Sequence, residues 1–315
     1  MVMVVLQILV PLALVGWLAA WPATSWLGLG LQGLGTGLVL LALWRVALWG
    51  VPPRWVIAGF GVIWLLAAAC ALWRLAGAGA PLWPRGTAAW TGLAIAAGLA
   101  GLGGAAATAA LWSALPPQGQ VVELGVPLGP GHYLVAHGGR REITNVHLKT
   151  LDPGVPRFAD WRGQSFAVDY LGLGRFGFSH PPDLPPDPAT YPIFGAPVVA
   201  PCAGRVVAAR DGLPDMRVPR MDSARKLGNH VILDCGGVWV VLAHLRRGSV
   251  GVAAGAHVGR GAALAEVGNS GNSSQPHLHL HAQSPGRAGA PAAGVPLPIR
   301  VNGGYPVRND VLVIR

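Results

Sequence analysis

The segment of this chain that most suggests chemistry is "QPHLHLHAQ" at Gln275–Gln283, where His277, His279 and His281 are each separated by one residue. In an extended strand, alternate side chains leave the same face, so the three imidazoles would point in one direction with about 7 Å between neighbours. Neutral imidazole is the commonest metal ligand in proteins, and it titrates near neutral pH. The segment therefore fits a metal site or an acid–base site, and also a solvated strand face rich in histidine.

The rest of the chain has two different compositions. Residues 1–115 contain eleven of the thirteen Trp residues and no Asp, Glu, Lys or His, and their only charges are four arginines. All ten histidines and all thirteen acidic residues lie in the remaining 200 residues. This division predicts that the two parts face different solvents.

Residues 1–115 contain four apolar runs, each close to the roughly 20 residues that cross a hydrocarbon core. Tryptophans at the ends of these runs fit an aromatic belt, and prolines lie between them. We therefore expect about four transmembrane helices rather than the buried helices of a soluble protein, with the first as an uncleaved anchor rather than a signal peptide. The four runs are Val2–Trp21, Leu27–Trp49, Trp55–Leu75 and Ala88–Trp112.

The membrane orientation does not follow from charge. One loop is flanked by Arg45 and Arg54 and another by Arg74 and Arg85, so the two loops carry equal positive charge. An even number of spans places both termini on the same side. The net charge of +10 is scattered, which excludes a nucleic-acid-binding stripe and fits mild attraction to anionic lipid or cell-wall polymer.

The pattern changes after a short polar linker, residues 116–120 within "SALPPQGQ". Residues 121–315 contain short runs of alternating apolar and polar residues, separated by turn residues every eight to twelve positions. This part is expected to be an all-β sandwich or distorted barrel. The Pro-rich segment Ser179–Pro192 is expected to be a long surface loop that overhangs a site.

Four segments of this β-rich part resemble, in order and spacing, the lysostaphin-type zinc metallopeptidases that cut peptide cross-links of bacterial peptidoglycan. The resemblance covers roughly Gln164–Gln283. The histidine pair preceded by "GNSGNSSQP", with "AHL" upstream, makes it specific. The four segments are "GAPVVAPCAGRVV", "GNHVILD", "VVLAHL" and "GSVGVAAGAHVGRGAALAEVGNSGNSSQPHLHLH".

The resemblance implies a role for each matched residue. His279 would be a zinc ligand, His277 and His244 catalytic imidazoles, and Asp169 in "QSFAVDY" the carboxylate ligand. Zinc held by three protein groups keeps one position for a water molecule that attacks an amide carbonyl. A regular strand over "VWVVLAH" would place His244 on the same face as Leu242, at the edge of a groove.

One ligand of the family pattern is missing. The histidine expected four residues before Asp169 is replaced by Ser165. We predict His147, in "GGRREITNVHLK", as the substitute, with His281 and His180 as weaker candidates. The remaining interpretation is that zinc binding is impaired.

Two hypotheses on function follow. The first is a membrane-anchored zinc endopeptidase acting on peptidoglycan, with its C-terminal domain outside the cytoplasmic membrane. The second is a degenerate peptidase fold that binds cell wall or activates a partner amidase. A third interpretation, a lipoyl- or biotin-carrier hairpin, requires a lysine at a turn, and Lys149 and Lys226 are the only lysines and lie in no such turn.

The cysteines bear on the compartment. Cys202 and Cys235 flank two segments that can run antiparallel, so they can pair in an oxidising space or remain two free thiols. Cys70 lies inside the third apolar run.

Overall fold

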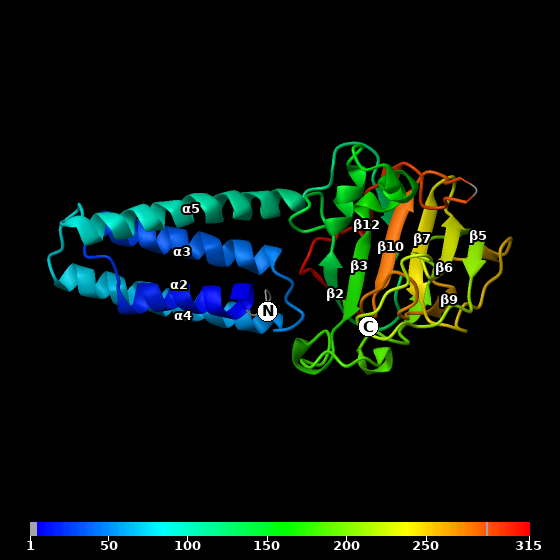
Figure 1. Ribbon diagram of the computed structural model, residues 1–315, viewed down its shortest axis with the longest axis horizontal. Coiled ribbons are helices and arrows are strands. Elements are labelled where there is room, and N and C mark those ends of the chain that lie inside the picture. The colour runs from blue at the N-terminus through cyan, green and yellow to red at the C-terminus, as the bar shows by residue number, and fades with distance from the viewer. Residues whose placement is uncertain (1–4, 288) are drawn as a thin grey trace. The chain divides into compact units, whose positions relative to one another are not determined.

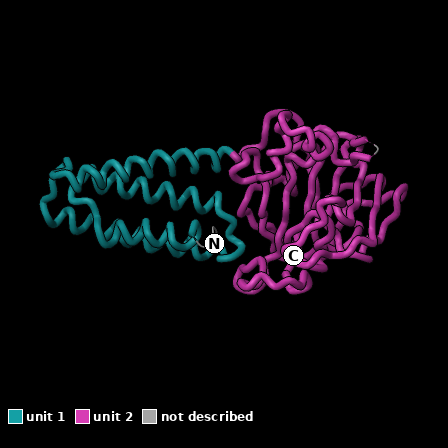
Figure 2. Tube along the Cα trace, in the orientation of Figure 1, with its two compact units in different colours: residues 1–112 teal, residues 113–315 magenta. Residues whose placement is uncertain are grey.

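The computed structural model describes residues 5–287 and 289–315. The chain divides into two compact units, residues 1–112 and 113–315 (Figure 2). The first is helical and the second is rich in β-strands (Figure 1). The expected succession of an apolar helical part and a β-rich part is therefore confirmed.

Helices occur in all four predicted runs, and three of them are long and apolar enough to cross a membrane by length and composition. The first described helical segment, Val5–Ala20, is shorter. The start of the predicted run Val2–Trp21 lies outside the described residues. The helical elements of this unit are η1 (Val5–Leu9), α2 (Val10–Ala20), α3 (Trp26–Val46), α4 (Arg54–Gly77) and α5 (Thr87–Ser113).

The second predicted run, Leu27–Trp49, ends earlier than expected. Helix α3 ends at Val46 because Ala47 is extended, and the indole Nε1 of Trp49 donates to the carbonyl of Leu43 at 2.9 Å. Trp49 is consequently fully buried. Its expected place in an aromatic belt was wrong, whereas Trp21 and Trp55 are exposed.

Small polar side chains lock the helices of this unit together. Ser25 caps α3 by accepting from the amide of Gly28, and Thr36 Oγ1 accepts from Trp64 Nε1 on α4 at 2.8 Å. A buried hydroxyl that pairs with an indole satisfies both groups inside an apolar bundle. These contacts fix how α3 packs on α4.

The second unit is built on one nine-stranded sheet. Eight strands follow the order β13-β2-β3-β10-β7-β6-β5-β8, and β11 pairs with the end of β10. All pairs in this sheet are antiparallel. The strands are β2 (Gly131–His137), β3 (Val168–Gly172), β5 (Gly204–Arg210), β6 (Asn229–Asp234), β7 (Trp239–Leu245), β8 (His257–Val258), β10 (Leu278–Gln283), β11 (Pro296–Leu297) and β13 (Val311–Ile314).

Two small sheets and several 3-10 helices complete the unit. The small sheets pair β1 with β12 and β4 with β9. The strands are β1 (Val122–Leu124), β4 (Pro197–Val199), β9 (Ala263–Glu266) and β12 (Ile299–Val301), and the 3-10 helices are η2 (Val146–Leu151), η3 (Pro156–Phe166), η4 (Arg175–Gly177) and η5 (Pro188–Thr190).

The main core lies on one face of the large sheet. Val240 of β7 and Leu280 of β10 pack there with Val198 and Leu264 from the small sheets, and all four are fully or almost fully buried. On the opposite face, Val241 and Ala243 of β7 form a second cluster, against which Trp161 of η3 packs. The sheet therefore has apolar contacts on both faces, with the short helices over the second one.

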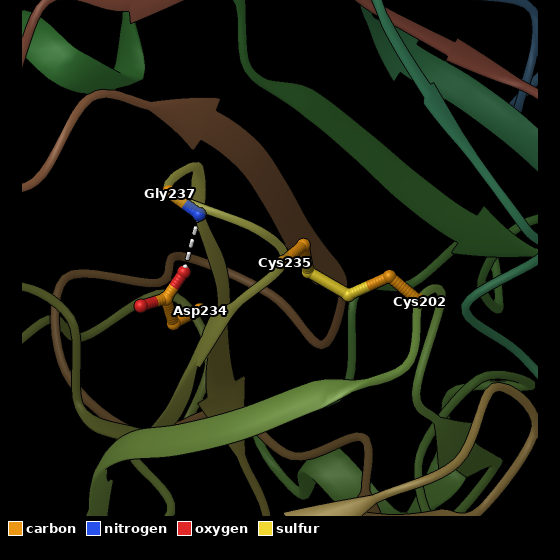
Figure 3. The surroundings of a disulfide bond; sticks show 4 residues. All are labelled: Cys202, Asp234, Cys235 and Gly237. Atoms are coloured by element: carbon orange, nitrogen blue, oxygen red, sulfur yellow. Dashed lines mark hydrogen bonds between the residues drawn. A yellow bond between two sulfur atoms is a disulfide. The ribbon is translucent and has the colours of Figure 1, made fainter.

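A disulfide joins Cys202 to Cys235 (Figure 3). Cys202 precedes β5 and Cys235 follows β6, and these two strands pair with Arg205 opposite Asp234. The bond thus closes the outer hairpin of the large sheet near its open end. Of the two alternatives open from the sequence, the structure contains the pair.

The disulfide should contribute measurably to stability. A bond that closes a segment with a sequence separation of 33 residues restricts the unfolded chain, which corresponds to about 3–4 kcal/mol in the loop-entropy description. We expect Cys202→Ala/Cys235→Ala to lower the thermal unfolding midpoint of the β-rich unit, measured by calorimetry on the full chain in detergent. Cys70→Ala is the control, and equal midpoints for all three proteins would contradict the expectation.

Candidate metal centre and active site

The candidate residues lie side by side on one face of the large sheet. In β10, Leu278 and Leu280 point into the main core, so His279 and His281 point to the opposite face. His279 is directly opposite Asp169 of β3 on one side and Ala243 of β7 on the other. Directly opposed residues in antiparallel strands share a face. The adjacent strands β3, β10 and β7 thus place one row of side chains on this face of the sheet.

His244 joins this row because of a β-bulge. The pairing of β6 with β7 passes from Ala243 directly to Leu245 and leaves His244 as the extra residue, with a φ of +65°. This left-handed conformation is rare for a residue with a side chain, and it turns the imidazole toward the row. The ring centroids of His244 and His277 are 4.7 Å apart. The expectation that His244 shares a face with Leu242 was therefore wrong.

A second bulge brings in His137, which the sequence did not single out. The pairing of β2 with β3 shifts between Val135 and His137, and His137 becomes the partner of Asp169. Arg308 donates to His137 Nδ1 at 2.9 Å. An arginine cannot accept, so the proton of the neutral ring is on Nε2. Burial lowers the pKa of His137 to about 3, which keeps the ring neutral.

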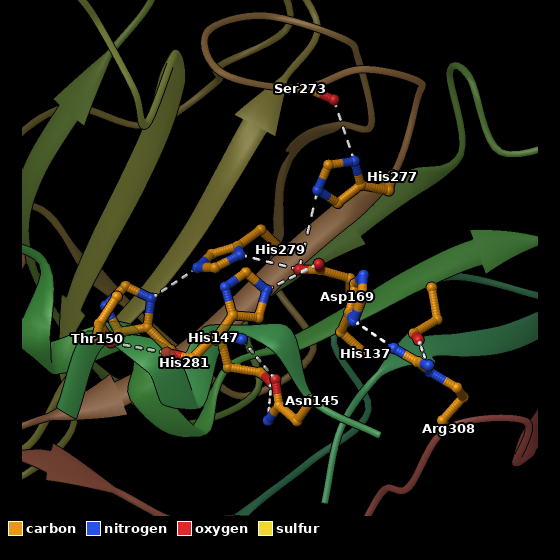
Figure 4. A network of polar contacts seen from close by, with 12 residues as sticks. His137, Asn145, His147, Thr150, Asp169, Ser273, His277, His279, His281 and Arg308 are labelled. Atoms are coloured by element: carbon orange, nitrogen blue, oxygen red, sulfur yellow. Dashed lines mark hydrogen bonds and ion pairs between the residues drawn. The ribbon is translucent and has the colours of Figure 1, made fainter. Parts of the chain in front are cut away.

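Asp169 is the centre of the site (Figure 4). Its Oδ2 lies 2.9 Å from His147 Nε2, and its Oδ1 lies 2.9 Å from His279 Nδ1 and 3.8 Å from His277 Nε2. Only 6% of the residue is exposed. Burial alone would raise the pKa of this carboxyl, but the neighbouring His147 and His277 hold the pKa well below its usual value. The carboxylate is therefore ionised and surrounded by imidazoles.

His147 reaches Asp169 from the 3-10 helix η2 rather than from a strand. Asn145 caps this helix: its side-chain oxygen accepts from the amide of His147, and its amide donates to the carbonyls of Gly139 and Ala167. The caps tie η2 to the start of β3, which carries Asp169. The position of His147 is set by this cap.

Ser165, the residue at the expected ligand position, supports the same helix. Its hydroxyl lies 2.8 Å from Thr150 Oγ1, and Thr150 donates to the carbonyl of His147 at 2.7 Å. Ser165 is fully buried, and its single hydroxyl proton is shared between Thr150 and the carbonyl of Arg162, which lies 2.6 Å from Oγ. The serine that replaces a ligand thus helps to hold the segment that carries His147.

A chain of buried hydrogen bonds runs along β10 behind His279. The amide nitrogen of Gln283 donates to the carbonyls of Ser284 and Pro291, so its oxygen faces His281 Nε2, at 3.3 Å. His281 Nδ1 lies 3.0 Å from His279 Nε2. Both His281 and Gln283 are fully buried.

This chain decides which nitrogen of His279 carries a proton. An amide oxygen only accepts, so His281 must present Nε2–H to it. Burial holds the pKa of His281 well below its usual value, so the ring has one proton and its Nδ1 must accept from His279 Nε2–H. His279 Nδ1 is then an unprotonated acceptor 2.9 Å from the carboxylate of Asp169. Two acceptors at this distance repel unless a cation or a proton joins them.

His277 and His244 have the opposite arrangement. Their Nδ1 atoms face backbone carbonyls, that of Gln275 at 2.8 Å and that of Ser270 at 2.9 Å. Each ring therefore donates Nδ1–H to the backbone, and its Nε2 is the nitrogen that can exchange a proton. Burial holds the pKa of His244 well below its usual value, so this ring is a neutral base.

The donor set fits a metal ion. Two groups have ligand atoms within 4.8 Å of one another, His147–Asp169–His279 and His244–His277–His279. The first contains the ionised carboxylate and the unprotonated Nδ1 of His279, and a buried anion beside a bare imidazole nitrogen is what a divalent cation offsets. Two imidazoles and one carboxylate also match the nitrogen and oxygen donors that zinc takes in catalytic sites. We therefore assign the first group as the candidate ligand set.

The site opens into a pocket of about 260 Å³. None of the described residues from the Pro-rich segment Ser179–Pro192 lines it, so this segment does not overhang the site as expected. His180 faces the carbonyl of Pro181 and contacts Tyr191. His180 and His281 are therefore outside the candidate ligand set. The pocket is lined by His137, Val146, His147, Lys149, Trp161, Gln164, Asp169, Met221, Lys226, Leu227, His244, Asn272, Ser274, His277 and His279.

Residues 190–291 match the family model described as Peptidase family M23. The match takes in His244, His277 and His279 and begins after Asp169 and His147. The similarity to peptidase family M23 is thus carried by residues 190–291. The departure from the family pattern is at Ser165, outside the matched residues. No curated protein matches the chain.

Several solved structures are similar to parts of this chain. One is the SpoIIQ–SpoIIIAH pore-forming complex, at 19% identity, 37% of this chain, 56% of that chain and a TM-score of 0.25. The catalytic domain of the prophage-encoded M23 protein EnpA from Enterococcus faecalis has 19% identity and a TM-score of 0.29, with 53% of this chain and 88% of that chain covered. The antimicrobial peptidase lysostaphin from Staphylococcus simulans has 17% identity over 53% of this chain and 44% of that chain, with a TM-score of 0.26. Similarities at this level do not assign a function.

The hydrogen-bond chain behind His279 gives a testable prediction. We expect His281→Leu to weaken zinc binding about 10- to 100-fold, as loss of a partner behind a histidine ligand does in other zinc sites. Without zinc, the imidazole ¹⁵N chemical shifts of His279 should indicate the Nε2–H tautomer in the wild-type chain. In His281→Leu they should indicate a mixture of tautomers. His281→Gln, which keeps an acceptor, should retain part of the affinity.

His257→Ala is the control, because His257 is exposed on β8 and does not line the pocket. Unchanged zinc affinity and unchanged His279 shifts in a folded His281→Leu protein would contradict the assignment of the tautomer chain.

Proposed function

We propose that this chain is a membrane-anchored zinc metalloendopeptidase that hydrolyses peptide bonds of bacterial peptidoglycan. The observation that carries the proposal is the buried set of His147, Asp169 and His279, with His244 and His277 beside it in one pocket. The match to a peptidase family supports a hydrolytic role.

His147, Asp169 and His279 would hold the zinc through Nε2, a carboxylate oxygen and Nδ1. Zinc held there supplies a Lewis acid that acidifies a water molecule and polarises an amide carbonyl. The tautomer chain through His281 keeps the Nδ1 lone pair of His279 available. The cap by Asn145 and the contacts of Thr150 keep His147 within reach.

His277 and His244 would move the protons. Each gives Nδ1–H to a carbonyl, so Nε2 is the nitrogen that would accept a proton and then donate it. One of them takes the proton of the attacking water, and a protonated imidazole then donates to the leaving amine. His137 keeps its proton on Nε2, so it would serve as a hydrogen-bond donor at the pocket.

For the whole chain we propose about four transmembrane helices in residues 1–115, a linker at 116–120 and a peptidase domain at 121–315. Three helices of sufficient length and apolarity support the membrane part. The disulfide between Cys202 and Cys235 supports an extracytoplasmic C-terminal domain, because disulfides persist in oxidising compartments. Peptidoglycan also lies outside the cytoplasmic membrane.

The replacement of a family ligand by Ser165 favours a second candidate function, a degenerate module that binds cell wall or activates a partner amidase. The contact of His147 with Asp169 argues against it, because a third ligand is then present. Zinc content separates the two candidates.

We expect about one zinc per chain in the purified full-length protein, measured by elemental analysis. His279→Ala and His147→Ala should lose it, since each removes one of three ligands. His132→Ala, on an exposed position of β2, is the control. The same preparations should digest isolated peptidoglycan, and His277→Ala should keep its zinc while losing at least about 100-fold in rate, as for a missing acid–base group.

A folded wild-type chain that takes up no zinc would exclude the enzyme and leave the degenerate module. Zinc that survives His147→Ala would exclude His147 as the ligand.

The membrane orientation has its own test. If both termini lie outside the cytoplasm, alkaline phosphatase fused after Arg315 should be active, because it needs an oxidising space to form its disulfides. The same enzyme fused after Gly79, in the loop before α5, should be inactive. The reversed pattern would place the C-terminal domain in the cytoplasm.

A further inference from the structure

The two lysines of this chain both lie at the pocket. The 315 residues contain 23 basic residues, of which only Lys149 and Lys226 are lysines, and both line the pocket that contains the candidate metal site. Every other basic residue is an arginine, which forms fixed, bidentate pairs, whereas lysine provides a compact charge on a flexible stem. The two flexible, positively charged side chains of this protein thus both lie at the pocket that contains the candidate metal site.

Lys226 is held beside the two candidate acid–base histidines. Its carbonyl accepts from the amide of Asn272, in the loop before His277, at 3.0 Å. The next carbonyl, of Leu227, accepts from the amide of His244 at 3.1 Å. The ammonium lies 4.5 Å from the centroid of the Trp161 ring, which also lines the pocket. An aromatic ring stabilises the charge without neutralising it.

Lys149 is carried by the same short helix as His147. It follows His147 by two residues in η2, and the contact of Thr150 with Ser165 fixes that helix to η3. Lys149 is exposed. Each lysine is therefore anchored by a segment that also positions a residue of the site.

Neither ammonium is compensated within the protein. Across residues 5–287 and 289–315, neither Lys149 nor Lys226 makes an ion pair or a side-chain hydrogen bond. Asp169 is the one acidic residue among the described residues that line the pocket, and it is occupied by histidines. Asp222, near Lys226 in the chain, pairs with Arg225 at 2.6 Å. The pocket mouth therefore has two uncompensated positive charges beside a cation site.

We propose that Lys149 and Lys226 form a binding site for a carboxylate of the substrate, so that the pocket selects acidic peptides over neutral ones. The inference rests on the proposed function for the position of the peptide in the pocket. The pocket volume of about 260 Å³ suits one or two residues rather than a long polymer. Two ammonium groups among the residues that line the pocket also steer an acidic peptide toward the site.

The test is equilibrium binding of two blocked peptides, Ac-Ala-Glu-Ala-NH2 and Ac-Ala-Gln-Ala-NH2, to the full-length protein in detergent at low ionic strength. We expect the Glu peptide to bind about 5- to 10-fold more tightly, the size of one or two partly screened ion pairs. Lys149→Met/Lys226→Met should abolish the preference, and Lys149→Arg/Lys226→Arg should keep most of it. Arg300→Gln, at an exposed position of β12, should have no effect.

Equal affinities for the two peptides, or the same loss of preference in Arg300→Gln, would overturn the proposal. A poly(glycerol phosphate) chain that binds more tightly than the Glu peptide through the same lysines would overturn the peptide as the occupant. Failure here is separable from failure of the proposed function. Zinc binding and peptidoglycan digestion without a Glu preference refute only the carboxylate site, whereas a lysine-dependent preference without digestion refutes only the hydrolase.

Discussion

The site depends on a single amide group. Gln283 gives both of its N–H protons to backbone carbonyls, so it can only accept from His281. The donor direction of this bond fixes the tautomers of His281 and His279 in turn. It leaves the unprotonated Nδ1 of His279 facing the carboxylate of Asp169. All residues of this hydrogen-bond chain are buried, so water cannot hydrogen-bond to an alternative tautomer and stabilise it. Two acceptors are thus held close together, an arrangement that a bound cation would stabilise.

The large sheet places the other residues of the candidate site beside this hydrogen-bond chain. Adjacent strands place Asp169, His279 and Ala243 in one row, and two bulges add His137 and His244 to it. The bulge at His244 costs backbone strain, of about 1–3 kcal/mol for a residue in a sparsely populated conformation. The packed core on the other face keeps the register that maintains this strain.

The sequence singled out residues that the structure brings together, but it did not give the faces from which they come. The spacing of His277 and His279 follows from the two-residue period of a strand, and the apolar runs predicted the helices. The face of His244 was wrong because a bulge has no signal in an alternating pattern. Trp49 was misplaced because its contact with the carbonyl of Leu43 depends on how the chain folds after α3. His137 was overlooked because its partner, Arg308, is 171 residues away.

The candidate ligands differ in the elements that carry them. Asp169 and His279 belong to central strands, whose hydrogen bonds open only when the sheet itself opens. His147 belongs to a short 3-10 helix, a type of segment with weaker internal bonds that opens locally at a lower free-energy cost. An ion would therefore enter and leave by displacement of η2 while the other two ligands stay in place. The cap at Asn145, which stabilises η2, would then set the rate of metal exchange.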